Sequence, residues 1–238
     1  MSISIIIPIK NEEDVILETL KKLEESWIVH VDHEILIIND YSTDKSVELI
    51  KNENFKKLKV ILLDNPNVGL GSAIKCGIDN SSNEFINIYM ADMSDSIGDL
   101  KTYYEKIKDN KSLDAIFGSR FVKDSKVMNY PKIKLLLNRL ANNLIKIIFF
   151  SKYNDFTNAF KIYKKTTLVK LYPLVSENFN IFLELPLKVE CRKFKYEIIP
   201  ISWNGRKLGD SKFKLNEISS KYIFTMLYCL LEKILLNK

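Results

Sequence analysis

The segment FINIYMADMSDS, residues 85–96, decides the fold that this sequence predicts. Its first half is apolar and suits a buried parallel strand, and the segment then turns polar at Asp92, Ser94 and Asp95. In open α/β sheets, small molecules bind beyond the carboxyl ends of the strands. These three side chains are therefore candidate ligands that hold Mg²⁺ or Mn²⁺ against a diphosphate. A polar turn that caps a helix beginning near Ile97 is an equally good interpretation.

Strands and helices are predicted to alternate on both sides of this segment. Helical patterns separate four more apolar strand candidates, at residues 2–9, 34–38, 60–63 and 114–117. This alternation predicts an α/β fold with a mostly parallel central sheet flanked by helices. Asp40 and Arg120 follow the second and fifth strands, so we expect both to lie near Asp92 at one edge of the sheet.

A glycine pair follows the third strand, in the sequence NPNVGLGSAIKCGI. Gly69 and Gly71 could present backbone N–H groups to a phosphate at the start of a helix. The pattern lacks the third glycine of a dinucleotide fingerprint and the Lys-Ser/Thr pair of a P-loop. Close packing of the helix on a strand is therefore the favoured use of these glycines.

The composition indicates one large α/β domain, or a domain with an appendage, in a chain of 238 residues. Three widely spaced cysteines fit neither a disulfide framework nor a zinc-binding pattern, so we expect a reducing compartment. The apolar start of the chain is followed directly by NEED, which indicates a first strand rather than a signal peptide. The only histidines, His30 and His33, are predicted to lie on the surface.

Basic and apolar residues are interleaved between residues 132 and 170, where nine Lys or Arg accompany a single acid, Asp155. Residues 132–150 form a helix candidate with an apolar stripe, and residues 218–236 form a second apolar helix that is too short to span a bilayer. This pattern favours an anionic partner on a partly apolar surface, either the lipid phosphates of a membrane or nucleic acid. A solvated helix face is the alternative.

Taken in order, these segments resemble glycosyltransferase family 2, and within it the dolichol-phosphate and polyprenyl-phosphate hexose (mannose) synthases. The matching motifs are SIIIPIKNEE, EILIINDYSTDKS, NVGLGSAIKCGI, YMADMSD, FGSRF, DFTNAFKIYKK and RKLGDSKFKL. The resemblance implies a GT-A domain over residues 1–215, with residues 216–238 as an apolar helix that is membrane-peripheral or packed on the domain. It also implies a GDP- or UDP-linked sugar donor, Mg²⁺ or Mn²⁺, and a lipid-linked phosphate acceptor in place of nucleic acid.

The resemblance also assigns residues. Those implied for the donor nucleotide are Pro8, Glu12, Asp40, Asp92, Arg206, Ser211 and Lys212. Those implied for the acceptor phosphate are Arg120, Arg139 and Asn143. The implied catalytic set is Asp92, Arg120, Asp155, Arg206 and Lys212, and the metal would rely on Asp92, Ser94 or Asp95.

Two residues depart from the family pattern. Met90 stands where the first aspartate of the DxD motif would be, and Lys10 replaces an aromatic residue, which leaves guanine and uracil both open.

The kind of acceptor decides whether a base is needed. A sugar hydroxyl must lose a proton to a general base, whereas a phosphate monoester, with a second pKa of about 6, is already largely a dianion at neutral pH. Asp155 and Glu184 are the residual base candidates, and ion pairing with nearby lysines and arginines explains both equally well.

We therefore expect transfer of a hexose from a nucleotide sugar to a polyprenyl or dolichyl phosphate, by a protein peripheral to the cytoplasmic face of a membrane. A membrane-protein partner or a homo-oligomer is compatible with this expectation. The first alternative is a transferase of the same fold that acts on a saccharide, and the second is a nucleotide-binding or membrane-docking module without turnover.

Overall fold

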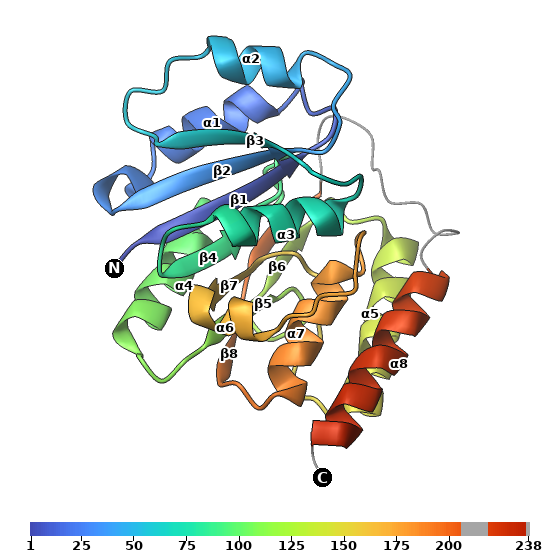
Figure 1. Ribbon diagram of the computed structural model, residues 1–238. Coiled ribbons are helices and arrows are strands. Elements are labelled where there is room, and N and C mark those ends of the chain that lie inside the picture. Colours follow the sequence, from blue (N-terminus) through green and yellow to red (C-terminus); the bar gives the residue numbers. More distant parts are fainter. Residues whose placement is uncertain (206–218, 237–238) are drawn as a thin grey trace.

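A seven-stranded sheet forms the centre of the computed structural model, which describes residues 1–205 and 219–236 (Figure 1). Its strands, in spatial order, are β3 (Val60–Asp64), β2 (His33–Asn39), β1 (Ile3–Ile9), β4 (Phe85–Ile88), β7 (Lys161–Lys164), β5 (Ala115–Ser119) and β8 (Tyr196–Pro200). Only β7 runs antiparallel to its neighbours, β4 and β5. The prediction of a mostly parallel sheet is therefore confirmed.

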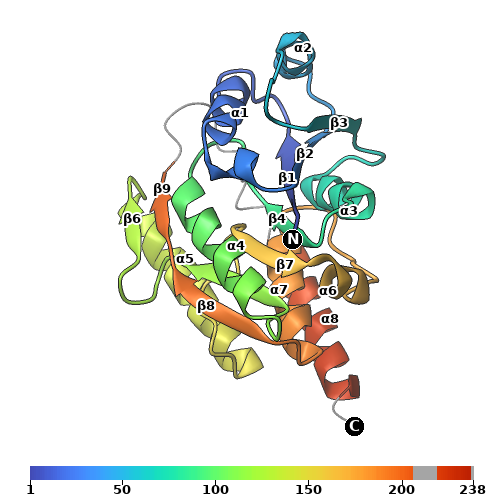
Figure 2. The same cartoon turned by 90° about the vertical axis from the view of Figure 1, so that its left-hand side faces the viewer.

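Helices cover both faces of the sheet, with α1 and α4 on one side and α3 and α6 on the other (Figure 2). Their bounds are α1 Ile16–Glu24, α2 Ser46–Asn52, α3 Leu70–Asn80, α4 Ile97–Asp109, α5 Lys132–Phe149, α6 Lys165–Lys170, α7 Ile181–Cys191 and α8 Ser219–Leu236, with a short 3₁₀ helix at Trp27–His30. In β1, Ile5 and Ile7 pack toward α1 and α4, whereas Ile6 packs toward α3 and α7. Full burial of each such side chain contributes about 1.5–3 kcal/mol, which explains why this strand is apolar on both faces.

Strands β1 and β4 separate where the polar residues begin. β1 pairs with β2 as far as Ile9, but its pairing with β4 ends at Ile6. Since Tyr89 N donates to Ile6 O, the even-numbered positions of β1 face β4. Pro8 therefore lies beyond the last β4 partner, where a residue without an N–H costs no ladder hydrogen bond.

A small second sheet brings a late segment to the carboxyl end of β4. It pairs β6 (Lys126–Met128) with β9 (Ser202–Asn204) in parallel. Next to it, Asn204 N donates to Ser94 O over 2.9 Å, and Trp203 forms a β-bridge with Asp95. The acidic turn after β4 is thus tied to an aromatic residue more than 100 positions later.

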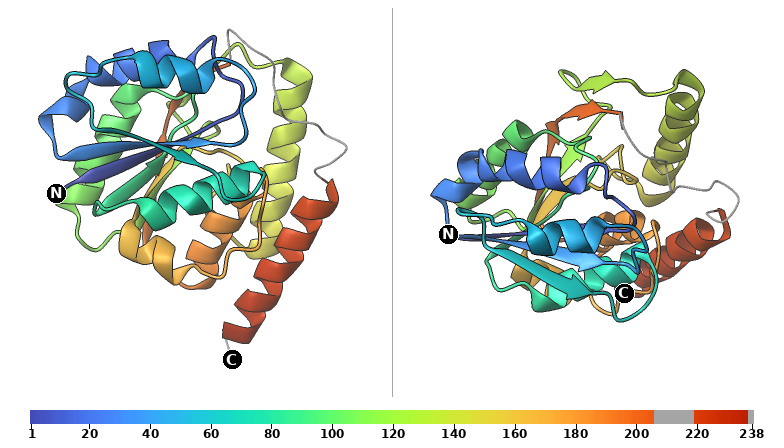
Figure 3. Two further views of the ribbon diagram at one scale, coloured as in Figure 1. Left: turned by 45° about the horizontal axis from the view of Figure 1, so that its top comes forward. Right: turned by 90° about the horizontal axis from the view of Figure 1, so that it is seen from above.

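Helices α5 and α8 lie on the same side of the molecule (Figures 1 and 3). Thr225 and Cys229 of α8 are fully buried against the domain, and Lys233 Nζ donates to Phe149 O at the end of α5. The outer faces of both helices are apolar and exposed. Within residues 1–205 and 219–236, no helix is both long enough and apolar enough to cross a membrane.

Candidate active site

The loops after β1 and β2 are joined to each other. Asn11 Oδ1 accepts a hydrogen bond from Thr43 N over 2.7 Å, and Glu12 N donates to Ser46 Oγ over 2.8 Å. Asn11 has a φ of 52°, in the left-handed region that asparagine tolerates better than most residues. Glu12 is therefore held at the strand ends, next to the loop that follows Asp40.

Asp40 is buried at the end of β2, with 5% of its surface exposed. Its Oδ1 accepts hydrogen bonds from Gly69 N and Asn65 Nδ2, each over 2.8 Å. Its Oδ2 lies 3.3 Å from Lys10 Nζ. The carboxylate is thus fixed from one side by the glycine loop and paired with a half-exposed lysine on the other.

The glycine loop packs against a different part of the chain from the one predicted. A Cβ on Gly69 would lie 2.3 Å from Glu177 O, and one on Gly71 would lie 2.4 Å from Ser176 O. Gly69 also has a φ of 128°, which side chains rarely allow. Both N–H groups are used within the protein, by Asp40 and by Glu177 O. Close packing is confirmed as the role of these glycines, but their neighbour is the segment before α7 rather than a strand.

The turn after β4 is a tight acidic structure. Asp92 Oδ1 accepts a hydrogen bond from Ser94 N over 3.1 Å, and Met93 has a φ of 56°. The cap of α4 is Ser96, whose Oγ accepts from Asp99 N over 3.2 Å. The prediction that this polar turn caps a helix beginning near Ile97 is therefore confirmed, but the capping residue is Ser96, and Asp92, Ser94 and Asp95 lie before it.

Asp95 carries an unsatisfied carboxylate oxygen. Its Oδ1 is buried and has no hydrogen-bond partner among the described residues. Burial, together with the negative charge of Asp92, raises the pKa of Asp95 to about 8. Such a group is stabilised by any cation placed beside it.

Asp92 and Asp95 could supply only some of the ligands of a metal ion. In the described portion of the chain, no three His, Cys, Asp or Glu residues gather closely enough to hold a metal ion. Magnesium, however, is commonly held by one or two carboxylates together with substrate phosphates. Asp92 and Asp95, with its unsatisfied oxygen, could supply these one or two carboxylates. Ser94, which lies between them in sequence, is buried.

Arg120 and Asp155 form a buried ion pair. Arg120 donates from its backbone N and from Nε to Asp155 Oδ2, each over 2.8 Å, and from Nη2 to Oδ1 over 2.6 Å. The side chains are 7% and 0% exposed. Burial acts to lower the pKa of Arg120, but the charge and hydrogen bonds of Asp155, together with the nearby Tyr130 and Tyr153, raise it overall, so the guanidinium stays charged.

Aromatic rings connect this pair to Arg139 on α5. The Arg120 guanidinium lies 5.3 Å from the ring of Phe121 and 5.6 Å from that of Trp203. Arg139, which is exposed, lies 5.6 Å from the same Phe121 ring. The structure thus brings together the two arginines predicted to hold the acceptor phosphate. Asn143 is exposed one turn further along α5, and none of the hydrogen bonds or ring contacts of the described residues joins it to this cluster.

Lys161 is a buried residue of this region that the sequence patterns did not single out. Only 1% of its surface is exposed, and its Nζ donates to Phe156 O over 3.2 Å and to Asn158 O. Burial lowers its pKa to about 7, although Asp155 acts in the opposite direction. The available signal was a single charge inside the apolar run AFKIY.

Three other predictions have different outcomes. Glu184 is fully buried in α7, where it accepts from Val175 N and Ser176 N and pairs with Lys188, so it is part of the packing. His33 is buried at the start of β2, so the prediction that it lies on the surface was wrong. The predicted residues Arg206, Ser211 and Lys212 lie outside the described residues.

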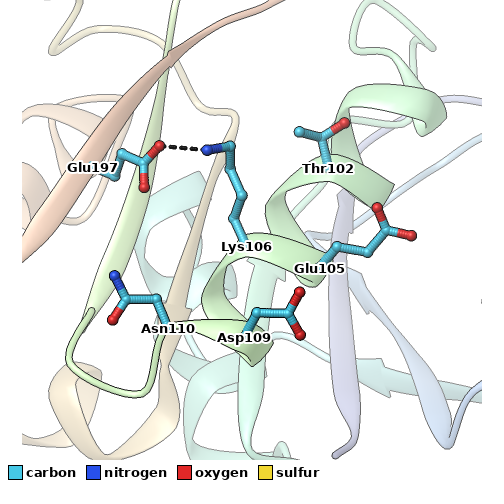
Figure 4. Close-up of a pocket in the computed structure, with 6 residues that line it drawn as sticks. All are labelled: Thr102, Glu105, Lys106, Asp109, Asn110 and Glu197. Atoms are coloured by element: carbon cyan, nitrogen blue, oxygen red, sulfur yellow. Dashed lines mark hydrogen bonds and ion pairs between the residues drawn. The ribbon is translucent and has the colours of Figure 1, made fainter.

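A depression of about 560 Å³ lies elsewhere, beside the C-terminal half of α4 (Figure 4). It is lined by exposed polar side chains, and its Lys106–Glu197 ion pair spans 2.6 Å. Because α4 begins directly after the acidic turn and runs away from it, this depression is separate from the strand ends that hold the candidate site.

Comparisons with known proteins agree with this arrangement. A family model described as Glycosyl transferase family 2 matches residues 4–171. The chain is 27% identical to a dolichyl-phosphate beta-glucosyltransferase from Trichomonas vaginalis, covering 77% of this chain and 56% of the relative. It is 26% identical to a dolichol-phosphate mannosyltransferase from Pyrococcus furiosus, covering 90% of this chain and 60% of the relative. The chain therefore spans little more than half the length of these curated relatives.

Solved structures confirm the fold. Glucosyl-3-phosphoglycerate synthase from Mycobacterium tuberculosis, in complex with phosphoglyceric acid, matches with a TM-score of 0.69 at 14% identity, over 96% of this chain and 80% of that one. The same enzyme in complex with Mn²⁺, UDP and phosphoglyceric acid matches with a TM-score of 0.69 at 13% identity, over 96% and 78%.

Proposed function

The chain belongs to glycosyl transferase family 2, and from this premise we propose that it transfers a hexose from a GDP- or UDP-linked sugar to a polyprenyl or dolichyl phosphate. The two relatives named for dolichyl phosphate support this acceptor class. The proposed catalytic domain is residues 1–215, and residues 216–238 form the proposed peripheral helix.

The donor is proposed to lie across the carboxyl ends of β1, β2 and β4. Asp40, which is fixed by the glycine loop, would contact the base, with Pro8 and Glu12 beside the nucleotide. Arg206, Ser211 and Lys212 belong to the sequence motif proposed to bind the diphosphate.

A divalent cation, Mg²⁺ or Mn²⁺, would be held by Asp92 and Asp95, with Ser94 as a further candidate, and would neutralise charge on the diphosphate leaving group. The unsatisfied oxygen of Asp95 supports this placement, and the Mn²⁺ in the similar synthase structure supports the use of a divalent cation. Asp95 replaces the carboxylate that Met90 cannot supply.

The observation that best supports the proposed acceptor is that Arg120 engages both oxygens of the Asp155 carboxylate. Three hydrogen bonds from Arg120 occupy its carboxylate, and the side chain is fully buried. Such a group is poorly placed to take a proton from a sugar hydroxyl. A phosphate dianion needs no such base, so positioning and charge stabilisation are sufficient.

Arg120 and Arg139 would then hold the acceptor phosphate. Asp155 occupies one edge of the Arg120 guanidinium, and the Phe121 ring that contacts this guanidinium also contacts Arg139 on α5. Guanidinium groups bind phosphates through paired N–H donors, and their charge is permanent at physiological pH.

A membrane surface is the proposed location of the acceptor. Helices α5 and α8 expose large apolar side chains, each more than half accessible: Ile133, Leu136, Leu137, Leu140, Leu144, Ile147, Ile223, Phe224, Leu227, Leu231, Ile234 and Leu235. Lys132, Lys134, Arg139 and Lys146 lie on α5, which has no acidic residue. An apolar face bordered by cations suits the interface of an anionic membrane, here the cytoplasmic one.

A donor screen tests the proposal. Purified protein is incubated with a panel of GDP- and UDP-sugars, Mg²⁺ or Mn²⁺, and a short polyprenyl phosphate, and release of the nucleoside diphosphate is followed. We expect release that requires both the lipid phosphate and the metal. Nucleotide-sugar binding without lipid-stimulated release would favour a saccharide acceptor, and an absence of binding would leave a module without turnover as the better description.

A further inference from the structure

We infer that Lys161 and Asp155 are positioning residues of the acceptor site: Lys161 holds the turn that carries Asp155, and Asp155 sets the direction of the Arg120 guanidinium. The inference rests on the proposed function for the identity of the acceptor. The arrangement of the three side chains does not depend on it.

The first step is the contact between Asp155 and Arg120. Nε and Nη2 lie on one edge of the guanidinium, and both donate to Asp155. The same carboxylate accepts from the backbone N of Arg120, which fixes the main chain together with the side chain. No acceptor other than Asp155 bonds to Arg120 within residues 1–205 and 219–236. The direction of the remaining N–H groups of the guanidinium is therefore set by its bonds to Asp155.

The second step is the turn that holds Asp155. Asn158 N donates to Asp155 O over 3.2 Å, which closes the turn. Lys161 Nζ reaches back from β7 and donates to Phe156 O and Asn158 O. One ammonium thus ties two carbonyls of the turn to the central sheet.

The third step is the link between this turn and the strand that ends at Arg120. Asn158 Nδ2 donates to Gly118 O over 3.2 Å, and Tyr153 OH donates to the same oxygen over 2.8 Å. Ser119 Oγ donates to Asn154 Oδ1 over 2.6 Å. The turn is therefore connected to each of the two residues before Arg120. A shift of the turn would be transmitted to the guanidinium.

The burial of Lys161 indicates why a lysine is present. A buried lysine is costly unless its N–H groups are bonded. Here they bond to backbone carbonyls, and the ammonium lies 5.5 Å from the ring of Tyr153. An apolar residue of similar size would fill the space but would leave two buried carbonyls without a donor. The lysine thus specifies the position of the turn.

Lys188 provides a matched control. It is also fully buried, and it also donates to two backbone carbonyls, of Leu171 and Pro173. It lies on α7 and pairs with Glu184 and with Glu232 of α8, and none of its described hydrogen bonds or ion pairs reaches Arg120 or the Asp155 turn. Because its replacement also leaves the buried Glu184 without an ion-pair partner, it should disturb folding at least as much as replacement of Lys161, but without moving Arg120.

The first readout is independent of turnover. In ¹⁵N–¹H spectra, the Nε–H of Arg120 should give a resonance protected from exchange, identified by its loss in Arg120→Lys. We expect Lys161→Met to lose or shift this resonance and Lys188→Met to keep it. An unchanged Arg120 resonance in Lys161→Met would overturn the inference, whatever the activity.

The second readout is kinetic. We expect Lys161→Met to raise the KM for polyprenyl phosphate about tenfold to hundredfold, while the Kd of the nucleoside diphosphate stays within about twofold. Lys188→Met should leave both close to wild type. Equal effects of the two variants on the acceptor KM would contradict a positioning role. If the wild-type protein shows no turnover with any lipid phosphate, the proposed function fails, and the spectra still decide the inference.

Discussion

Every described hydrogen bond to the Asp155 side chain comes from Arg120, which donates from its backbone N, Nε and Nη2 over 2.6–2.8 Å. The two residues are 35 positions apart in sequence and lie at the end of β5 and in the loop before β7. The pair fixes the guanidinium at the sheet edge and engages both oxygens of Asp155, which makes that carboxylate a poor general base.

Replacing Asp155 with Asn should affect stability more than the chemical step. The variant leaves the buried Arg120 charge without its partner, so we expect a loss of about 3–5 kcal/mol in the free energy of unfolding, measured in urea. With a phosphate acceptor, kcat should stay within about tenfold and the main effect should be on KM. A general base would contribute about 10²–10⁴-fold to kcat. Asp124→Asn, at an exposed position, is the control, and a kcat loss of that size in Asp155→Asn alone would contradict our account.

Replacing Gly71 with Ala should destabilise the protein although the residue lies in a helix. Its Cβ would meet Ser176 O at 2.4 Å and Glu177 C at 2.7 Å, both backbone atoms. We expect a loss of about 1–3 kcal/mol in urea unfolding, together with weaker nucleotide binding. Gly98→Ala, in the first turn of α4, has only Ser96 Oγ nearby, at 3.4 Å, and should be neutral or slightly stabilising. Equal stability of the two variants would show that the loop does not need this close contact.

Stability should depend on pH through Lys161. Burial lowers its pKa in the folded state to about 7, whereas the unfolded lysine keeps its ordinary value near 10.4. Between these values the unfolded chain binds more protons, so the contribution of Lys161 to stability increases as pH rises from about 7 to 10. The difference in unfolding free energy between wild type and Lys161→Met should shift in favour of wild type over this range. A difference that is constant with pH would mean that the lysine is not desolvated as the structure indicates.

Binding to vesicles should depend on the exposed leucines of α5. Leu136→Ser with Leu140→Ser removes two side chains that are 59% and 57% exposed. We expect at least tenfold weaker binding to vesicles that contain anionic lipids, since each buried CH₂ contributes about 0.8 kcal/mol. Thermal stability should change little. Val169→Ser, at a residue of α6 that is 56% exposed, is the control, and an equal loss of binding there would count against α5 as the docking face.

The sequence was sufficient for the fold because its strands are continuous apolar runs that end in polar residues. The run IIIPI in β1 and EILII in β2 predicted buried parallel strands, and Asp40, Asp92 and Arg120 lie at the strand ends as expected. Local patterns could not show that β7 inserts antiparallel between β4 and β5. The insertion depends on pairing between segments that are far apart in the sequence.

The pairing of Arg120 with Asp155 depends on the same insertion, because the loop before β7 carries Asp155 to the end of β5. The sequence also could not predict the burial of Lys161, since lysines are normally assigned to the surface. His33 was mistaken for a surface residue because the second strand was predicted to begin at Glu34, whereas β2 begins at His33. Its ring is buried because Nδ1 contacts Val31 O at 2.9 Å and Lys59 N donates to Nε2.

The most direct test of the central claim compares acceptors under one donor. The protein, its preferred nucleotide sugar and metal are incubated in parallel with a polyprenyl phosphate, the corresponding polyprenol and a panel of saccharides, and transfer of labelled sugar is measured. Because Arg120 engages both oxygens of Asp155, we predict transfer to the phosphate alone, with Arg120→Lys losing it. Transfer to the polyprenol or to a saccharide at a rate comparable to that for the phosphate would contradict the account, since it would require a general base, a role for which Asp155 is poorly placed.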